Sequence, residues 1–381
     1  MSSATSADVI VLGLGGMGSA TAAHLARRGA TVIGVDAFQP GHANGSSHGE
    51  TRIIRKAYFE SPDYVPMLER AYQLWNDLEA ESGQTLLTVN GALNIGSAES
   101  GFVTGATRSA REFGLNVEEL DAAEVRERFP GFQLPENLVA LFDPEGGFLR
   151  PERCTAAHLD SARRHGAMLR FNEPVLEWGT DGDGVFVRTA TERITAGKLV
   201  ITAGPWSKDV ISEWDAPLIV WRIVNVHFDS TTAQRFAPEQ CPVFLMEVPE
   251  GHYYGFPALP GQGVKIGRHD IGAVCTPDTI DREVHDDEIA MLRNVLDTYM
   301  PGSSGAVLRT LTCMYTNTPD QHFVLDHHPT NDNVVIGCGF SGHGFKFASV
   351  IGEILSQLAL DSESQLDIGF LAAGRFSKEL R

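Results

Sequence analysis

Three glycines near the start of the chain have the spacing of a loop that binds the phosphates of a dinucleotide. Gly13, Gly15 and Gly18 form the pattern G-x-G-x-x-G directly after an apolar run at residues 9–12. The first glycine permits a tight turn, the second lets the backbone approach a pyrophosphate, and the third lets the next helix pack on the strand. The N-terminus of that helix carries unpaired N–H groups and partial positive charge, which attract phosphate. The spacing therefore predicts a dinucleotide site.

An acidic residue at the end of the second apolar run strengthens this prediction. Asp36 follows the run at residues 31–35, about 20 residues beyond the glycines, where a carboxylate can accept hydrogen bonds from ribose hydroxyls and would repel a 2′-phosphate. A glycine pattern by itself is more often an ordinary turn. Here the strand, the helix and the acid agree, so we favour a dinucleotide, although this stretch alone does not separate NAD from FAD.

Five further motifs lie in order along the chain. They are residues 45–55 (GSSHGETRIIR), 253–257 (YYGFP), 264–269 (VKIGRH), 313–316 (CMYT) and 339–347 (GFSGHGFKF). Through these motifs the sequence resembles the monomeric sarcosine oxidases and the similar N-methyltryptophan oxidases, which are flavoenzymes that oxidise secondary amino acids. The resemblance covers nearly the whole chain, and it implies a D-amino-acid-oxidase-like fold.

The cofactor implied by this resemblance is FAD, bonded covalently through the sulfur of Cys313 to the 8α-methyl group of the flavin. From its chemistry alone, a cysteine on a strand would more often be simply buried. Tyr315 and residues 320–323 follow Cys313 in the order of the family, and they favour the flavin linkage. The cofactor-binding residues that we expect are Gly13, Gly15, Gly18, Asp36, Gly204, Cys313, Gly342, Gly344 and Lys346.

Arg55 and Lys346 resemble the pair that holds the carboxylate of the substrate. A buried carboxylate needs charge-assisted donors, and a guanidinium can donate two parallel hydrogen bonds. The alternatives are a solvated arginine and a lysine at a helix start, where the dipole disfavours a cation. Tyr254, Tyr315 and His269 resemble residues that shape the substrate side of the flavin, although aromatic residues on strands most often belong to the core.

One residue, at position 245, leaves the size of the substrate pocket undecided. Leu245 stands close to the substrate where the sarcosine branch is expected to have methionine, although residues 246–249 and 276–280 resemble that branch more than the N-methyltryptophan branch. The choice between sarcosine and a bulkier N-methyl amino acid therefore stays open.

The reaction implied is hydride removal from the N-methyl carbon to flavin N5, followed by hydrolysis of the iminium. The products would be glycine, formaldehyde and, after reduction of oxygen, hydrogen peroxide. Only the neutral amine can react, and nearby Arg, Lys and His residues would lower its pKa by like-charge repulsion, so no dedicated general base is required. Reduction of oxygen begins with superoxide, which a fixed cation stabilises.

Four more residues take catalytic roles from the resemblance. Lys265 matches the lysine of the family that stabilises superoxide, whereas without its motif a lysine on an alternating strand would be expected to face solvent. Thr51, Arg52 and His48 match residues that lie by the other face of the flavin ring.

The elements that must position these residues follow from local patterns. Asn90-Gly91, between apolar runs at 86–89 and 92–95, predicts a β-hairpin. Asp121 and Glu124 predict a capping box for a helix that ends before Pro130. Further helices are predicted at 63–82, 151–166, 286–299 and from about 346 to 360. Strands are predicted at 168–171, 185–189, 199–202 and 307–315, and the segment 221–268 predicts a second, antiparallel sheet.

The order of these elements predicts two lobes, as the length of 381 residues also does. Residues 1–85, 145–220 and 320–381 form a discontinuous, Rossmann-like FAD-binding lobe, in which Gly204 ends an apolar strand. Residues 86–144 and 221–319 form an inserted, strand-rich substrate lobe. The fold class is therefore α/β plus antiparallel β.

Composition excludes several partners. The formal net charge of −19 argues against nucleic acid and anionic membrane, since both need a basic surface. No apolar run is long enough to span a bilayer and residues 1–7 lack the features of a signal peptide, so we expect a cytoplasmic protein. Five scattered cysteines without a CxxC pair indicate neither a disulfide framework nor a zinc site, and we expect no metal.

Two other functions stay open at this point. One is an NAD-dependent dehydrogenase, which residues 13–36 alone would support. The other is a non-catalytic dinucleotide-binding sensor whose Arg and Lys residues merely grip an anion. The partners that we expect for the oxidase are a small N-methyl amino acid and O2.

Overall fold

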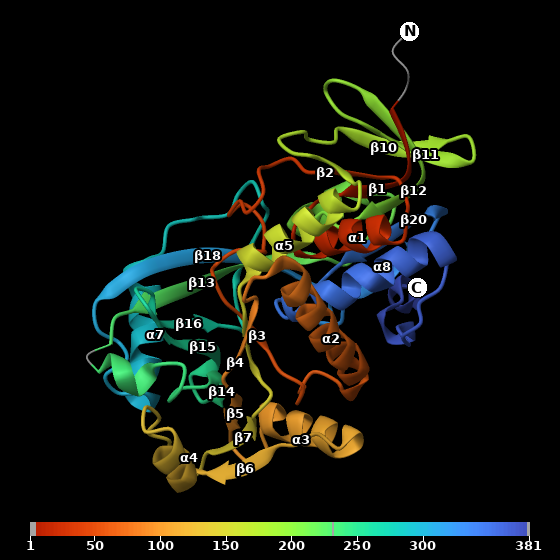
Figure 1. Cartoon of the computed structure of the whole chain (residues 1–381). Coiled ribbons are helices and arrows are strands. Elements are labelled where there is room, and N and C mark those ends of the chain that lie inside the picture. Colours follow the sequence, from red (N-terminus) through yellow and green to blue (C-terminus); the bar gives the residue numbers. More distant parts are fainter. Residues whose placement is uncertain (1–4, 231, 379–381) are drawn as a thin grey trace.

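Three β-sheets and a layer of helices organise the chain in the computed structural model, which describes residues 5–230 and 232–378 (Figure 1). Residues 1–4 and 379–381, which belong to the predicted FAD-binding lobe, lie outside the described residues. An eight-stranded sheet lies with its helices in the upper part of Figure 1, and a nine-stranded sheet lies below it. A small three-stranded sheet completes the set.

The eight-stranded sheet has a parallel centre, β9-β2-β1-β12-β20, to which β10, β11 and β19 add antiparallel strands. Val9, Ile10 and Val11 of β1 have no exposed surface, which suits a strand covered on both faces. The strands are β1 Thr5–Leu12, β2 Val32–Val35, β9 Met168–Arg170, β10 Glu177–Asp181, β11 Gly184–Arg188, β12 Arg193–Ile201, β19 Val324–His328 and β20 Asn331–Cys338.

Four helices that are far apart in sequence gather beside this sheet (Figure 1). They are α1 Gly16–Arg27, α2 Val65–Ser82, α5 Pro151–Arg164 and α8 Ala348–Asp361. Gly352 of α8 touches α1 so closely that a Cβ atom there would lie 2.5 Å from the carbonyl carbon of Ala20. The first and last helices of the lobe therefore depend on small residues for their contact.

The nine-stranded sheet has the order β17-β13-β16-β15-β14-β5-β7-β6, with β18 also paired to β13. The strands of the segment 221–268 pair antiparallel with one another, as predicted, whereas β14 runs parallel to β5, which lies outside that segment. The strands are β5 Ala92–Gly96, β6 Glu118–Asp121, β7 Val139–Asp143, β13 Ile219–Phe228, β14 Val243–Val248, β15 Gly251–Leu259, β16 Gly263–Arg268, β17 Ala273–Cys275 and β18 Val307–Asn317.

The predicted hairpin at Asn90-Gly91 is wrong. The strand before it, β4 (Leu87–Val89), pairs with β8 (Gly147–Leu149), which also pairs with β3 (Arg52–Ile54), whereas β5 pairs with β7 and β14. Gly91 does have the positive φ of a turn, 84°. It is needed for a crossing between two sheets, where a Cβ atom would lie 2.3 Å from the ring of Phe142.

Of the remaining helices, α4 and α7 lie close to their predicted bounds, whereas α3 and α6 were not predicted. Asp121 and Glu124 form the expected capping box of α4. The other helices are α3 Gly101–Phe113, α4 Ala122–Arg128, α6 Ser207–Val210 and α7 Asp286–Tyr299, and 3₁₀ helices lie at Pro62–Tyr64, Gly204–Trp206, Ala233–Phe236, Phe345–Phe347, Gly369–Leu371 and Ala373–Lys378. Local patterns thus predicted helices well and strand partners less well.

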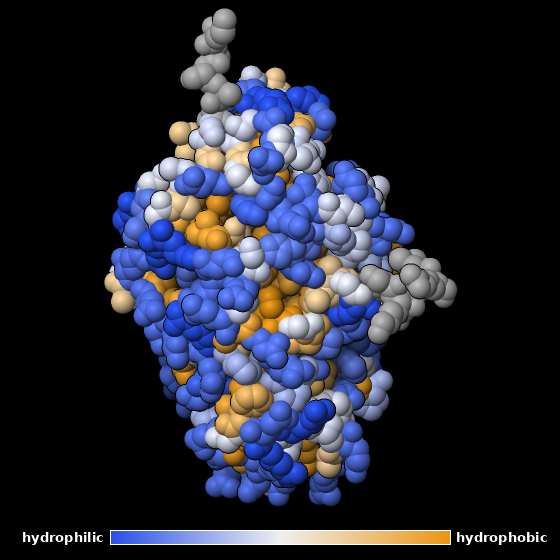
Figure 2. Space-filling model, turned by 90° about the vertical axis from the view of Figure 1, so that its right-hand side faces the viewer, coloured by the Kyte–Doolittle hydropathy of each residue, from blue (hydrophilic) through white to orange (hydrophobic). Residues whose placement is uncertain are grey.

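The face shown in Figure 2 is mostly hydrophilic, and hydrophobic residues appear on it as separate patches. Most large apolar side chains lie inside, in clusters on the two sides of each main sheet. Among the described residues, no helix combines the length and the apolar character needed to cross a bilayer.

Two buried histidines in the helical layer predict that acid destabilises the fold. Burial, with the charge of Arg27, lowers the pKa of His24 to about 4, and burial also holds the pKa of His158 well below its ordinary value. In the unfolded chain both titrate near pH 6.5, so below that pH the unfolded state binds more protons and stability falls. For His24 the loss by pH 4 is about 3 kcal/mol. Urea unfolding between pH 8 and pH 4 measures it.

The replacement His158→Gln supplies the direct test of this pH dependence. It should reduce the slope of unfolding free energy against pH, because glutamine does not titrate. His165→Gln, at an exposed position just beyond the same helix, is the matched control and should leave the slope unchanged. Equal slopes in the two variants would contradict the role given to His158.

Candidate active site

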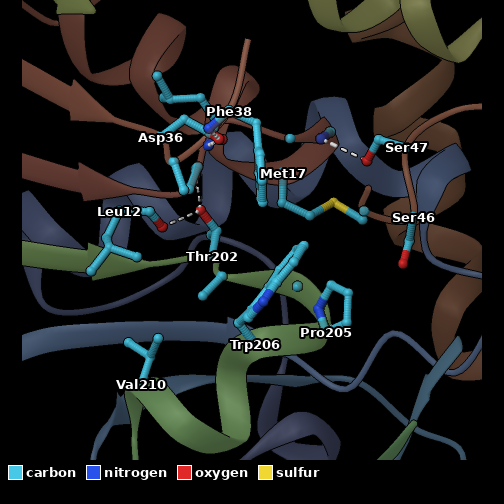
Figure 3. Close-up of a pocket in the computed structure, with 18 of the residues that line it drawn as sticks. Leu12, Met17, Asp36, Phe38, Ser46, Ser47, Thr202, Pro205, Trp206 and Val210 are labelled. Carbon is cyan, nitrogen blue, oxygen red and sulfur yellow. Dashed lines mark hydrogen bonds between the residues drawn. The ribbon is translucent and has the colours of Figure 1, made fainter. Parts of the chain in front are cut away.

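A cavity of about 750 Å³ lies beside the glycine loop that follows β1 (Figure 3). Segments from the whole length of the chain line it, including residues 12–17, 35–42, 45–47, 173–178, 202–206, 313–316 and 339–342. In Figure 3 the side chains of Met17, from α1, and Trp206, from the turn after β12, approach it from opposite sides. The cavity is therefore built only when both ends and the middle of the chain are in place.

The glycine loop has the geometry that its sequence predicted. Gly13 has φ +89°, and a Cβ atom there would lie 2.5 Å from the carbonyl oxygen of Thr202. The Thr202 hydroxyl donates to the carbonyl of Gly13 at 2.8 Å. A Cβ atom on Gly18 would lie 1.8 Å from the oxygen of Gly13, so the third glycine serves packing and does not itself line the cavity. Gly15 and the N-terminus of α1 open onto the cavity, as a phosphate site requires.

Asp36 lines the cavity with a carboxylate that also braces the loop. Its Oδ2 accepts a hydrogen bond from the backbone N–H of Leu14 at 2.7 Å, and its Oδ1 accepts one from Phe38 at 2.9 Å. Each carboxylate oxygen can accept more than one hydrogen bond. The predicted contact with a ribose thus stays a prediction, and the structure adds a second task, which is to hold the glycine loop in shape.

One face of the nine-stranded sheet carries most of the other predicted residues. Residues directly opposite each other on paired strands point to the same face. The pairs Tyr315–Trp221, Cys313–Ile223, Asn225–Gly267, Gly267–Tyr254 and Tyr254–Leu245 form one continuous row, and Lys265 pairs with Phe256 and His227 on the same face. The opposite face packs into a hydrophobic cluster that contains Val226, Phe244, Met246, Tyr253 and Ile266.

Cys313 brings its sulfur to the wall of the cavity. The thiol is 6% exposed, and Nη2 of Arg52 donates to Sγ at 3.6 Å. Arg52 is fixed by the carbonyls of Thr51 and Ser46, at 2.8 and 3.0 Å. The site therefore presents a thiol, held beside a guanidinium, to a large cavity.

Lys265 is buried, contrary to the usual position of a lysine on a strand. It is 2% exposed, and its Nζ donates to the carbonyl of Gly49 at 2.7 Å and approaches both oxygens of Thr51 at 3.2 and 3.3 Å. Burial, together with the charge of Arg52, holds the pKa of Lys265 well below its ordinary value. His48 lies near the same cations, and burial lowers its pKa to about 3.

The aromatic residues predicted near the substrate form one hydrogen-bonded group. The Tyr254 hydroxyl donates to Oδ1 of Asn225 at 2.7 Å, and Nδ1 of His269 lies 3.5 Å from the Tyr315 hydroxyl. Burial lowers the pKa of His269 to about 4, although the charge of Glu60 acts in the opposite direction. Tyr315 also packs on Gly342, where a Cβ atom would lie 2.4 Å from its ring.

Arg55 and Lys346 lie in a second buried group that sequence reasoning only partly identified. Arg55 is 1% exposed and donates through Nη2 to Glu60 at 2.8 Å, while its buried Nε has no hydrogen-bond partner among the described residues. Burial would raise the pKa of Glu60, but the charges of Arg55, His343 and Lys346 together outweigh burial and lower the pKa to about 2. The pair therefore keeps a donor available for another anion.

Three members of this group were missed in the sequence. Glu60 lies five residues beyond Arg55, and an acid so close to a buried arginine was a usable signal. Tyr58 and His343 carried no such signal, because the hydrogen bond between them joins residues 285 positions apart.

The structure brings together most of the predicted residues, but in two places. The cavity is lined by Gly13, Gly15, Asp36, Arg52, Gly204, Cys313, Tyr315, Gly342 and Gly344. Leu245 is 7% exposed and belongs to the apolar cluster beside Tyr254. His269 lies close enough to Arg55, Glu60 and Lys346 for their charges to affect its pKa. No group of three or more His, Cys, Asp or Glu residues is placed to hold a metal ion within the described chain.

Comparisons with known proteins agree on one group of enzymes. The family model described as FAD dependent oxidoreductase (DAO) matches residues 8–358. The monomeric sarcosine oxidase of Streptomyces avermitilis is 44% identical over 375 residues, covering 97% of this chain and 98% of that one. The N-methyl-L-tryptophan oxidase of Escherichia coli is 38% identical over 379 residues, covering 97% and 99%. The solved structure of NikD, an unusual amino acid oxidase essential for nikkomycin biosynthesis, matches with a TM-score of 0.85 and 26% identity over 97% of each chain.

Proposed function

This chain belongs to the FAD dependent oxidoreductase (DAO) family, and from that premise we propose that it oxidises sarcosine or a related N-methyl amino acid with O2 as the acceptor. It is a FAD-dependent amine oxidase. The NAD-dependent dehydrogenase and the non-catalytic sensor are therefore set aside. The observation that carries the substrate class is the buried pair Arg55 and Lys346, whose cations offer unused donors to a carboxylate.

The residues around the cavity fit FAD. The glycine loop and the N-terminus of α1 would hold the pyrophosphate, Asp36 would accept hydrogen bonds from a ribose, and Cys313 would carry the flavin; all of them line the cavity. FAD bound there supplies the acceptor for the hydride that the substrate loses. The cations of Arg55 and Lys346 would fix the carboxylate and disfavour the protonated amine, so that the amine keeps its lone pair.

The covalent link through Cys313 is part of the proposal and predicts an all-or-none result. After acid precipitation the yellow colour should stay with the pellet of the normal protein and leave the pellet of Cys313→Ala. The position of Cys313 supports this link, because it lines the cavity and its sulfur accepts a hydrogen bond from Arg52. Cys275→Ala, at a partly buried position on β17, is the matched control and should keep its colour. A coloured Cys313→Ala pellet would rule out this attachment site.

The choice of substrate is tested by peroxide release from sarcosine, N-methyltryptophan and proline. We expect sarcosine or another small N-methyl amino acid to react fastest, because Leu245, Tyr254 and Phe256 fill the face of the sheet that carries the predicted site residues with an apolar cluster. N-methyltryptophan is the second candidate, since a relative named for that substrate is 38% identical. Absence of peroxide with all three would reject the specificity. The lobe boundaries and the cytoplasmic location stay predictions.

A further inference from the structure

One tyrosine lies against both cations of the proposed carboxylate site. Tyr58 has no exposed surface, and the centroid of its ring is 4.6 Å from Cζ of Arg55 and 5.0 Å from Nζ of Lys346. Cations at this distance are attracted by the face of an aromatic ring. The ring of Tyr58 is therefore a shared support for the two side chains that would hold the substrate.

The direction of the hydrogen bond between Tyr58 and His343 follows from the other partner of the His343 ring. Nε2 of His343 lies 2.9 Å from the carbonyl oxygen of Gln321, and Nδ1 lies 2.6 Å from the Tyr58 hydroxyl. A carbonyl only accepts, so Nε2 carries the hydrogen, and in a neutral ring Nδ1 is then the acceptor. Burial lowers the pKa of His343 to about 3, which keeps the ring neutral at pH 7. The Tyr58 hydroxyl consequently donates to His343.

This direction leaves the oxygen of Tyr58 free to accept from Lys346. Nζ of Lys346 lies 3.3 Å from the Tyr58 hydroxyl and 2.6 Å from the carbonyl of His343. An ammonium has three N–H donors, so one remains for a ligand. Burial, with the charge of Arg55, lowers the pKa of Lys346 to about 7, although Glu60 acts in the opposite direction. Near neutral pH, an acceptor on the ammonium therefore decides how much of the lysine is charged.

We propose that Tyr58 is a positioning residue of the carboxylate site, where its ring supports Arg55 and Lys346 and its hydroxyl, oriented by His343, holds the Lys346 ammonium. This inference rests on the proposed function, because it takes Arg55 and Lys346 as the groups that bind the substrate. The charged and titratable groups that act on Lys346 are Arg55, Glu60, His269, His343 and Tyr58.

The test compares ligand binding by the normal flavoprotein and by Tyr58→Phe across pH 5.5–9.5. The probe is methoxyacetate, which has an ether oxygen in place of the amine of sarcosine and does not titrate in this range. Binding is read from the flavin absorbance and from calorimetry. Tyr58→Phe keeps the ring but removes the acceptor, so the pH at which binding is lost should fall by about one unit. The dissociation constant at pH 8 should rise about tenfold.

Tyr64→Phe is the matched control, because this tyrosine is also wholly buried but its hydroxyl bonds His322 instead. It should leave the pH midpoint unchanged. Should Tyr58→Phe fail to fold, His343→Phe gives the second test, since it frees the Tyr58 hydroxyl and should move the midpoint in the same direction. An unmoved midpoint in both variants overturns the role of Tyr58. Failure of the normal protein to bind methoxyacetate at any pH would instead count against the proposed function.

Discussion

Replacing Lys265 with methionine should slow reoxidation of the reduced flavoprotein by oxygen about a hundredfold or more. The first electron transfer to oxygen creates an anion, which a preorganised cation stabilises in a site that excludes water. Three oxygens, from Gly49 and Thr51, hold the Lys265 side chain in one position. Burial disfavours the charged form of Lys265. An anion such as superoxide, formed beside the ammonium, would therefore stabilise that charged form, and the ammonium would stabilise the anion.

The measurement separates the two half-reactions in a stopped-flow instrument. Anaerobic reduction by the substrate should change little in Lys265→Met, while reoxidation of the reduced protein by oxygen should change strongly. Lys265→Arg keeps a cation and should recover part of the rate. Lys198→Met, which removes a lysine on β12 bonded to Asn333, is the control for loss of charge elsewhere. Equal slowing of both half-reactions would contradict the role assigned to Lys265.

Replacing Arg55 with methionine should raise the KM for the substrate about a hundredfold, because a buried carboxylate would lose its guanidinium partner. Removal of one partner from a buried charge pair typically costs 2–5 kcal/mol, and a hundredfold corresponds to about 3 kcal/mol. The variant also leaves Glu60 without its 2.8 Å ion pair. The double variant Arg55→Met/Glu60→Gln removes that second effect and should show the same weak binding.

The control for Arg55 is its neighbour Lys56, whose ammonium pairs with Glu145 at the surface. Lys56→Met removes the same charge one residue away and should leave KM within about twofold, as exposed ion pairs contribute little. The dissociation constant of methoxyacetate, measured by titration, distinguishes lost binding from slower chemistry. A normal dissociation constant in Arg55→Met would show that another group holds the carboxylate.

The parts of the fold that sequence predicted best depend on neighbours in the chain. The glycine loop, the capping box of α4 and the bounds of α7 follow from residues within a few positions of one another. Asn90-Gly91 shows the limit of such patterns. Its turn geometry was foreseeable, but β4 and β5 pair with strands of different sheets, and those partners lie about 40 to 150 positions away in the sequence.

In the candidate site, too, the sequence identified residues that lie in local motifs and missed residues whose contacts depend on distant segments. Motifs indicated Arg55, Lys265, Cys313 and Lys346, and the structure shows why three of them are unusual, since these cations are buried. Glu60, Tyr58 and His343 could not be assigned in the same way. Their contacts depend on how the segment after β3 packs against the loop before α8, which only tertiary structure specifies.

The discontinuous construction of the cavity has a consequence for synthesis of the protein. Its wall contains Gly13 near one end of the chain and Phe345 near the other, and β20, which completes the parallel centre of the sheet, ends at Cys338. Contacts of such long sequence separation form late and slowly. The cavity therefore cannot close around a cofactor while the ribosome is still adding the first 344 residues, so cofactor capture must be a late event in maturation.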